Sequence, residues 1–443
     1  MTEFHPRGFA AGISCYDIDV DFEHAPNGPD GSRRRARFFV ELKARLAIPV
    51  LLVGVGGGVA GAAYIGLLNV LTRTLGPGSH TVLVQAAILV AVGVAITVIS
   101  RVLGDSGNVE LLVDNIHVLG GAEDVRTLRS LIPTSLLCIS AGGAMGPEAP
   151  LVQASGTLGT WVAARFDLDA EDMRILTITG MAAGFAVLFG APLGAALFAL
   201  EILHRRGLQY YEALLPALIG SLIGFAASVA LTGVGLEPLW QLPPVGQLQS
   251  TDLLWAVAIG VLGAAGAVVF TVVAAAARRV VARVPAYVVP AVGGLVLAGL
   301  FWWSPFALTN GEGQVQTVVA GSLTASALAV AVAAKFAGVI TTMAGRWKGG
   351  FIIPLFFMGF AGGQLLHLAF PSSNATVLMA GLAVALCAGV TKTPLGSTLA
   401  VTQMAGLTLL PMTLIAAVLA LVLTSSTVMI ETQRERTPNR VQR

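Results

Sequence analysis

Charged side chains are rare in the apolar part of the sequence, and Glu148 is the most informative of them. It lies in Gly146-Pro147-Glu148-Ala149-Pro150, where two prolines bracket it at the predicted start of a helix. The unpaired N–H groups and the positive dipole end of a helix N-terminus favour an anion. The carboxylate of Glu148 could occupy that place itself or yield it to a permeating anion. The alternative is that it merely caps its own helix.

Five further ionisable residues lie within or beside apolar runs. A charge inside a membrane is costly, so each is a functional candidate. Glu201 could belong to a proton path, or it could be structural and pair with Arg205 or Arg206 at helical spacing. The two lysines are expected to satisfy buried carbonyls or helix ends rather than to bind a permeating ion. The five residues are Glu110, Asp114, Glu201, Lys335 and Lys392.

No arrangement of residues indicates an enzyme. An intramembrane enzyme would need a nucleophile–base pair or a metal cluster at depth, and the sequence suggests neither. The six histidines and three cysteines show no metal-ligand spacing, so we expect no metal, no cofactor and no catalytic residue. The net charge of +2 is too small to indicate a nucleic-acid partner.

The composition places the chain in a lipid bilayer. Hydrophobic residues make up 55% and charged residues 11% of the 443 positions, whereas a soluble domain has about 25% charged residues. Apolar stretches near the roughly 20 residues of a spanning helix follow one another from 45 to 431. The predicted helices are 46–73, 81–103, 126–143, 170–188, 191–204, 212–232, 251–277, 285–303, 326–344, 375–390, 394–408 and 411–430.

Three more segments begin with clusters of Gly and Pro, and we interpret them as half-helices that start inside the membrane. They are 106–117, 148–165 and 351–370. Non-helical backbone at that depth is tolerated only where it lines a cavity. The half-helix N-termini are therefore expected to meet at such a cavity.

The two ends of the chain are polar and basic. Residues 1–44 lack an apolar core and are predicted to be a disordered tail with a basic end, and 432–443 form a second short tail. The arginines in both tails predict cytoplasmic termini by the positive-inside rule, in a plasma or inner membrane. His204-Arg205-Arg206 and Arg278-Arg279 would mark cytoplasmic loops.

An internal repeat divides the apolar region into halves of about 45–235 and 250–431. The segment 191–201 matches 393–403, and Gly146 to Pro150 with Gly159 recurs as Gly350 to Pro354 with Gly363. Duplicated halves with broken segments at matching positions place a transport site at the repeat interface. The fold class is thus an all-α polytopic membrane protein with many tilted and broken helices.

Three motifs resemble those of the CLC chloride channel and chloride–proton antiporter family. Gly146-Pro147-Glu148-Ala149-Pro150-x-Val152-Gln153 is similar to G-R-E-G-P-x-V-Q, with Pro147 for Arg and Ala149 for Gly. Gly349-Gly350-Phe351-Ile352-Ile353-Pro354 resembles G-G-x-F-x-P, and Gly104 to Glu110 resembles G-S-G-I-P-E more weakly. Further matches extend the resemblance from about 45 to 430.

The resemblance implies two inverted halves, an anion path within each subunit and a homodimer. Glu148 would be the external gate, and its protonation would open the outer path. The anion would be held by partial dipoles rather than full cations. The residues that the resemblance assigns to anion binding are Ser106, Gly107, Glu148, Ala149, Phe351 and Ile352.

Departures from the family pattern bear on mechanism. Ile202 stands where proton-coupled members have a second, internal glutamate, and all five tyrosines precede the C-terminal region that carries a central tyrosine in other members. We therefore predict transport of small anions, most simply chloride, with weak or no proton coupling. A proton-coupled antiporter and a fluoride-handling member stay open, although the Ser106 hydroxyl argues against the fluoride branch.

Overall fold

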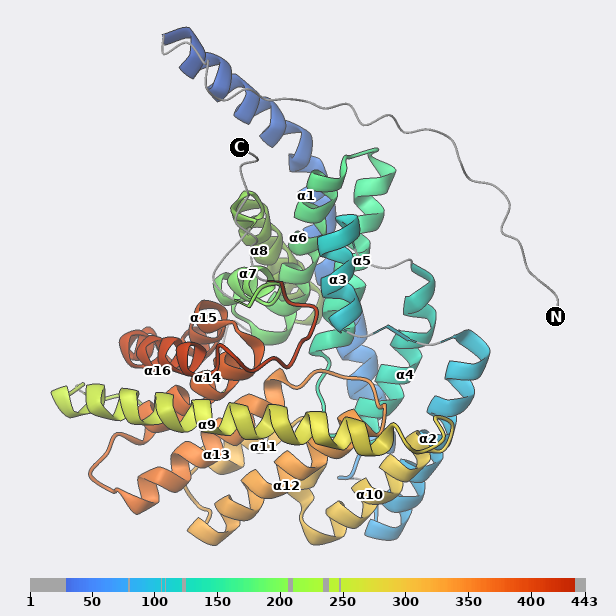
Figure 1. Ribbon diagram of the computed structural model, residues 1–443, viewed down its shortest axis with the longest axis vertical. Coiled ribbons are helices and arrows are strands. Elements are labelled where there is room, and N and C mark those ends of the chain that lie inside the picture. The colour runs from blue at the N-terminus through green and yellow to red at the C-terminus, as the bar shows by residue number, and fades with distance from the viewer. Residues whose placement is uncertain are drawn as a thin grey trace. The chain divides into compact units, whose positions relative to one another are not determined.

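The computed structural model describes residues 29–78, 80–104, 106–107, 109–121, 125–205, 210–233, 239–246 and 248–434. The chain divides into two units, Met1–Ala47 and Ile48–Arg443. Its described residues form helices of very unequal length joined by loops (Figure 1).

The first half of the apolar region holds eight of the α-helices in the described residues. They are α1 (Pro29–Leu75), α2 (Val82–Leu103), α3 (Val109–Leu119), α4 (Leu128–Ser140), α5 (Glu148–Arg165), α6 (Ala170–Phe189), α7 (Pro192–Glu201) and α8 (Leu214–Thr232). Short 3-10 turns precede two of them, at Val125–Thr127 and Tyr211–Ala213.

The second half contains the remaining described helices. They are α9 (Ser250–Val281), α10 (Val289–Trp303), α11 (Glu312–Val319), α12 (Ala325–Ala344), α13 (Ile352–Ala369), α14 (Ala375–Thr391), α15 (Pro394–Ala405) and α16 (Leu410–Leu423). Two 3-10 turns lie at Pro305–Ala307 and Leu407–Leu409. Every predicted helix has a counterpart, and the three predicted half-helices correspond to α3, α5 and α13.

Two helical segments differ from the sequence-based expectation. α1 begins at Pro29, so 29–44 are helical where the composition indicates a disordered tail, whereas 1–28 and 435–443 lie outside the described residues. Ala, Arg, Glu, Leu and Lys are strong helix formers, and they can extend a helix that the apolar stretch has already nucleated. α11 was not predicted because its sequence, EGQVQTVV, is too short and polar to read as a membrane segment.

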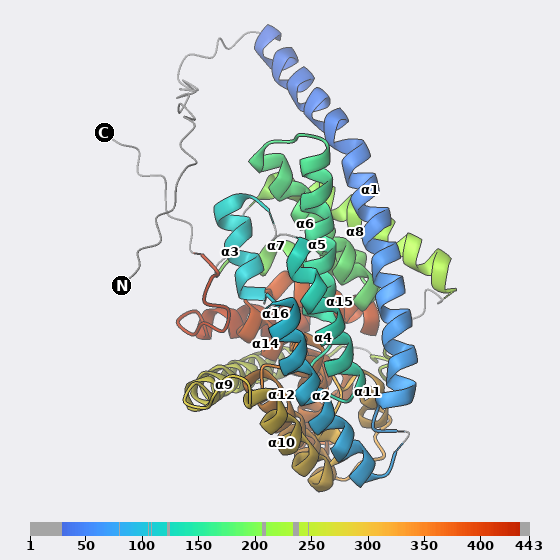
Figure 2. The ribbon, with the colours of Figure 1, turned by 90° about the vertical axis from the view of Figure 1, so that its right-hand side faces the viewer.

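Small residues let neighbouring helices pack closely within each half. α5 and α6 lie side by side in both views (Figures 1 and 2), and a Cβ added to Gly180 would lie 2.0 Å from the carbonyl oxygen of Ser155. In the second half a Cβ on Gly359 of α13 would lie 2.1 Å from the Cα of Ala383 in α14. Close backbone approach of this kind stabilises helix pairs in membranes, where lipid is as apolar as the side chains.

The two halves meet through pairs of residues that the predicted repeat makes equivalent. Gly146 and Gly350 exchange two backbone hydrogen bonds of 2.7 Å. The amide of Gly194 in α7 donates to Oε1 of Gln403 in α15 over 3.1 Å, and the amide of Gly396 in α15 donates to Glu201 in α7 over 2.8 Å. α7 and α15 are therefore antiparallel, which supports the predicted inverted repeat.

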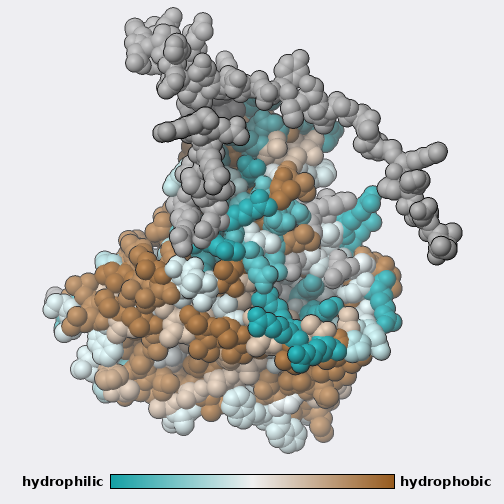
Figure 3. Space-filling model, in the orientation of Figure 1, coloured by the Kyte–Doolittle hydropathy of each residue, from teal (hydrophilic) through white to brown (hydrophobic). Residues whose placement is uncertain are grey.

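Part of the outer surface is apolar, as contact with a bilayer requires. Seven helical stretches in the described residues are long and apolar enough to cross a membrane: Arg45–Leu75, α2, α6, Tyr211–Thr232, α9, α12 and α13. Figure 3 shows hydrophobic residues gathered over the part that contains α9 and α16. Exposed side chains of α9 include Leu254, Val257, Val261 and Val272.

Candidate functional site

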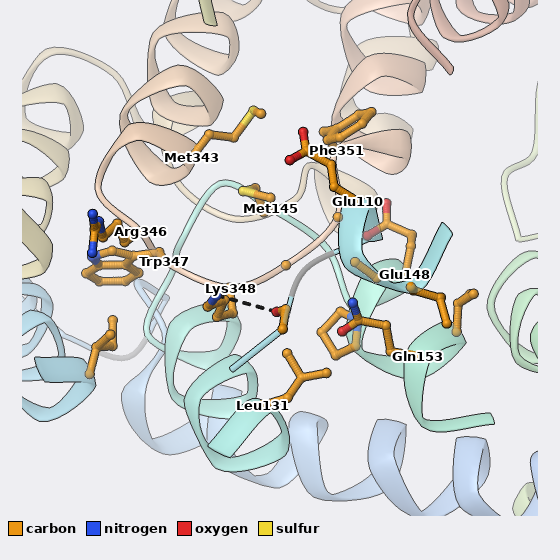
Figure 4. A pocket seen from close by; sticks show the side chains of 18 of the residues that line it. Glu110, Leu131, Met145, Glu148, Gln153, Met343, Arg346, Trp347, Lys348 and Phe351 are labelled. Carbon is orange, nitrogen blue, oxygen red and sulfur yellow. Dashed lines mark hydrogen bonds between the residues drawn. The ribbon is translucent and has the colours of Figure 1, made fainter. Parts of the chain in front are cut away.

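A cavity of about 570 Å³ lies where the loops before α5 and α13 meet. Five of the six residues predicted to bind an anion line it: Gly107, Glu148, Ala149, Phe351 and Ile352. Figure 4 shows Glu148, Gln153 and Phe351 on one side of the cavity, with Arg346 and Trp347 farther along. The half-helices therefore bring the predicted residues together.

The Glu148 carboxylate occupies the meeting point of two helix N-termini. Glu148 is the first residue of α5, its side chain is fully buried, and Oε1 accepts a hydrogen bond of 2.5 Å from the amide of Ile353 in the first turn of α13. Oε2 has no hydrogen-bond partner in the described part of the chain. A carboxylate thus sits where two sets of unpaired amides favour an anion.

Two glycines make room for this carboxylate. A Cβ added to Gly146 would lie 2.3 Å from Oε2 of Glu148, and one added to Gly350 would lie 2.6 Å from the same atom. These are the two residues whose backbones pair across the halves. Any larger residue at either position would compete with the carboxylate for the space that it occupies, which we call its seat.

Ile353 was missed by the sequence analysis, which assigned anion binding to Phe351 and Ile352. α13 begins at Ile352, so the second helical amide, rather than the first, reaches the carboxylate. The first four N–H groups of any helix lack intrahelical partners, so each was a possible donor. The position of Glu148 on the opposite side of the cavity determines which of these amides donates to its carboxylate.

Ser106 lies behind the cavity wall. Its side chain is buried, its hydroxyl has no hydrogen-bond partner in the described residues, and it is not among the lining residues, although Gly107 is. Its carbonyl oxygen accepts a hydrogen bond of 2.6 Å from Nζ of Lys348. Asp105 and Asn108, which belong to the same stretch of sequence, lie outside the described residues.

The cavity is also lined by full cations, which the sequence analysis did not anticipate. Lys348 stands directly before Gly349 and Gly350, and a lysine next to a glycine pair in an apolar region was the available signal. The other cations are Arg101, Arg278 and Arg346. Arg278 forms an ion pair of 3.3 Å with Glu110.

Glu201 does not line the cavity, whereas the next residue, Ile202, does. Its carboxylate accepts hydrogen bonds from the amides of Leu395 at 3.1 Å and Gly396 at 2.8 Å, at the N-terminus of α15. The expected pairing with Arg205 is wrong, because that guanidinium donates to the carbonyl of Glu431 and the amides of α15 are already within reach of the carboxylate. Arg206 lies outside the described residues.

The expectation for the two buried lysines is confirmed. Nζ of Lys335 donates to the carbonyls of Leu308 at 2.7 Å and Thr309 at 2.8 Å. Nζ of Lys392 donates to the carbonyls of Gly389 and Thr424, both at 2.6 Å. Both ammonium groups satisfy backbone carbonyls outside the cavity wall.

A histidine pair lies just beyond the end of α7. The ring of buried His204 contacts those of His117 and Tyr210 with centroid separations of 5.1 and 5.0 Å. Nε2 of His117 lies 2.8 Å from the carbonyl of Leu203. Burial lowers the pKa of His204 to about 4, so this ring is neutral at pH 7.

The histidine pair adjoins a C-terminal segment that contributes to the cavity wall. The backbones of His204 and Arg434 form an isolated parallel β-bridge. The side-chain amide of Gln433 donates to the carbonyls of Ile202 at 2.9 Å and Thr391 at 2.8 Å. Met429 and Ile430, a few residues earlier, line the cavity. The C-terminal segment is thus anchored to the end of α7.

A fold of broken helices whose N-termini converge on a buried carboxylate is the arrangement of an anion transport protein. The sequence model of the voltage gated chloride channel family matches residues 108–425. This chain therefore belongs to that family of membrane transport proteins and is not an enzyme. A relative from Pseudomonas syringae pv. tomato, a chloride/fluoride channel protein, is 27% identical in a 359-residue alignment that covers 78% of this chain and 76% of the relative.

Similarity to another curated relative and to two solved structures is consistent with this family assignment. The voltage-gated ClC-type chloride channel ClcB of Shigella flexneri is 29% identical over 65% of this chain and 70% of its own length. A CLC-type fluoride/proton antiporter covers 89% of this chain and 99% of its own at 22% identity and a TM-score of 0.77. A slow cyanobacterial Cl−/H+ antiporter covers 86% and 94% at 20% identity and a TM-score of 0.76. The integral, multi-pass helical membrane fold is that of the CLC structures.

Proposed function

We propose that this protein conducts chloride through the cavity and that Glu148 is its gate. The observation that carries the proposal is the seat of the Glu148 carboxylate, which occupies the place that two helix N-termini offer to an anion. The carboxylate and a permeating anion compete for this place. Protonation removes the negative charge of Glu148 and leaves the amide of Ile353 to the anion.

The gate is tested by Glu148→Gln in proteoliposomes loaded with chloride. The neutral side chain keeps the size of the glutamate but loses its charge, so we expect chloride flux to be maintained or raised and to lose its pH dependence. Gln364→Glu, a buried polar position in α13 outside the cavity wall, is the matched variant with the opposite charge change. Unchanged pH dependence in Glu148→Gln would refute the gate assignment.

We further propose that anion movement is weakly coupled to protons or not coupled at all. Ile202 lines the cavity and cannot titrate, and the carboxylate of Glu201, which is not among the lining residues, accepts hydrogen bonds from two amides of α15. A chloride gradient across proteoliposomes, with internal pH followed, tests this. Steady uphill proton movement at a fixed ratio to chloride would refute it, and its loss in Glu201→Gln would assign the inner proton carrier to Glu201.

Fluoride is the second candidate substrate, and the name of the Pseudomonas relative, a chloride/fluoride channel protein, favours considering it. A competition assay decides between the two halides. If fluoride moves readily and chloride does not compete with it, fluoride replaces chloride as the proposed substrate. Proton-coupled exchange of either halide is the corresponding alternative mechanism.

The protein is further proposed to be a homodimer with a separate anion path in each subunit, and to have both termini in the cytoplasm. The amide of Arg205 donates to the carbonyl of Arg434 over 3.3 Å, so the basic loop after α7 and the C-terminal segment lie on the same side. Arginines are enriched on the cytoplasmic side of membrane proteins. Cross-linking in the membrane and labelling of cysteines introduced at each terminus test these two proposals.

A further inference from the structure

The helices α2 and α10 form a closely packed pair, and residues of both line the cavity. They lie side by side in both views (Figures 1 and 2), and a Cβ added to Gly93 of α2 would lie 2.3 Å from the carbonyl oxygen of Pro290 in α10. The hydroxyl of Thr97 in α2 donates to the carbonyl of Tyr287 over 3.0 Å. The last turns of α2 and the residues before α10 are therefore fixed against each other.

An arginine with free hydrogen-bond donors lies at this junction. Arg101, in the last turn of α2, is exposed and lines the cavity, and the same is true of Tyr287. The guanidinium carbon of Arg101 lies 5.4 Å from the centroid of the Tyr287 ring, and the guanidinium has no hydrogen-bond or ion-pair partner in the described part of the chain. A guanidinium that packs over an aromatic ring keeps the N–H donors at its edge for another group, and their fork matches a phosphate.

No carboxylate of the cavity wall neutralises Arg101. Among the described lining residues the two acids are Glu110 and Glu148. Glu110 pairs with Arg278 over 3.3 Å, and Glu148 accepts from the amide of Ile353. The positive charge at the end of α2 is therefore available to a negatively charged ligand.

The surface of α2 that leads to Arg101 is apolar and exposed. Val94, Val98 and Arg101 follow one another at i, i+4 and i+7, so they share one face of the helix. Both valines are more than half exposed, and in α10 Leu295 is exposed as well. α2 is long and apolar enough to span a membrane, and only 28% of its apolar window is buried within the protein. This face is thus available to the acyl chains of lipids.

An apolar face that ends in an arginine and an exposed tyrosine matches the boundary between acyl chains and headgroups. Arginine side chains at the ends of spanning helices extend to the membrane surface, and tyrosine is enriched there. Basic residues beside a spanning helix attract anionic lipids. The ligand that fits Arg101, Tyr287 and the valine face together is therefore amphipathic and negatively charged.

We propose that Arg101 and Tyr287 form a binding site for the phosphate headgroup of an anionic phospholipid, whose acyl chains lie along the Val94–Val98 face of α2. Such binding is separate from the anion transport proposed above. A free phosphate would make no use of the apolar face, and a phosphatidylcholine headgroup carries its own cation beside the phosphate. The site therefore prefers an anionic phospholipid to either of them.

The test uses the purified full-length protein, freed of lipid in detergent, and measures lipid binding by native mass spectrometry. The probes are phosphatidylglycerol, phosphatidylcholine with the same acyl chains, and glycerol phosphate, which has the anionic group without the chains. Arg101→Gln removes the charge, and Tyr287→Leu removes the ring that the guanidinium packs over. Arg279→Gln is the matched control, because Arg279 is an exposed cation in the last turn of α9 outside the cavity wall. Melting temperatures verify that each variant is folded.

We expect the wild type to bind phosphatidylglycerol about fivefold more tightly than phosphatidylcholine. Arg101→Gln should lose this preference, Tyr287→Leu should reduce it, and Arg279→Gln should keep it. An equal preference in wild type and Arg101→Gln would overturn the inference. Equal losses in Arg101→Gln and Arg279→Gln would also overturn it, because the attraction would then come from the overall surface charge. If glycerol phosphate binds as tightly as phosphatidylglycerol, the ligand is a free phosphate compound and the lipid site is refuted.

Discussion

We predict that Gly146→Ala opens the gate although Glu148 itself is not substituted. The three heavy atoms nearest to a Cβ at this position all belong to the Glu148 carboxyl group: Oε2 at 2.3 Å, Cδ at 2.8 Å and Oε1 at 2.9 Å. Ordinary van der Waals contact begins near 3.4 Å, so the carboxylate must move by about 1 Å or more. The end of a flexible side chain can make that movement, so the backbone pairing with Gly350 is expected to survive.

The displaced carboxylate loses its hydrogen bond from the amide of Ile353. A hydrogen bond to a charged group contributes about 1.5 to 3 kcal/mol, so the balance between seated and displaced carboxylate should shift by a factor of about 10 to 100. We expect chloride flux at neutral pH to rise, and its dependence on pH to become weaker. Both are measured by chloride efflux from proteoliposomes between acidic and neutral pH.

Two other glycines provide the comparison. Gly313→Ala should leave flux unchanged, because nothing lies within 4 Å of the added Cβ. Gly350→Ala should instead reduce the yield of folded protein, because its Cβ would meet the amide nitrogen of Ala149 at 3.0 Å as well as the carboxylate. A folded Gly146→Ala protein with wild-type flux and wild-type pH dependence would refute the competition between carboxylate and anion.

Two further predictions concern stability. Since burial lowers the pKa of His204 to about 4, the unfolded state binds the extra proton between pH of about 6.5 and 4. The free energy of unfolding should therefore fall by up to about 3 kcal/mol as pH drops through that window. His204→Phe should show a smaller loss of melting temperature between pH 7 and 4.5, and an equal loss would exclude His204 as the cause. Lys392→Met should lower the free energy of unfolding by about 3 kcal/mol, because the carbonyls of Gly389 and Thr424 each lose a hydrogen bond from a charged donor and keep only neutral ones. An unchanged melting temperature would contradict this.

The sequence was most informative where a feature is local. Apolar length predicted the spanning helices, and the prolines around Glu148 predicted the start of α5, because both depend on nearest neighbours along the chain. α11 was missed because it is short and polar, and it is held through packing against α13. Length and hydropathy carry no information about such a tertiary contact.

Five of the six residues assigned to anion binding line one cavity, but the contacts within it could not be predicted. Glu148 and Ile353 are 205 residues apart, and Lys348 and Ser106 are 242 residues apart. Which amide meets the carboxylate, and which carbonyl meets the lysine, depends on how the halves are placed against each other. Glu201 shows the same limit, because spacing suggested an arginine partner nearby, whereas the structure gives it the amides of α15.

The reciprocal contacts between α7 and α15 have a consequence for biosynthesis. The acceptor for the amide of Gly194 is Gln403, which is synthesised 209 residues later. At about 5 to 20 residues per second, the ribosome needs about 10 to 40 s to reach it. During that time the first half waits in the membrane with the N-terminus of α7 lacking its partner from α15 and with Gly146 lacking its partner Gly350. The nascent first half should therefore be a target for membrane chaperones and proteases until the second half arrives.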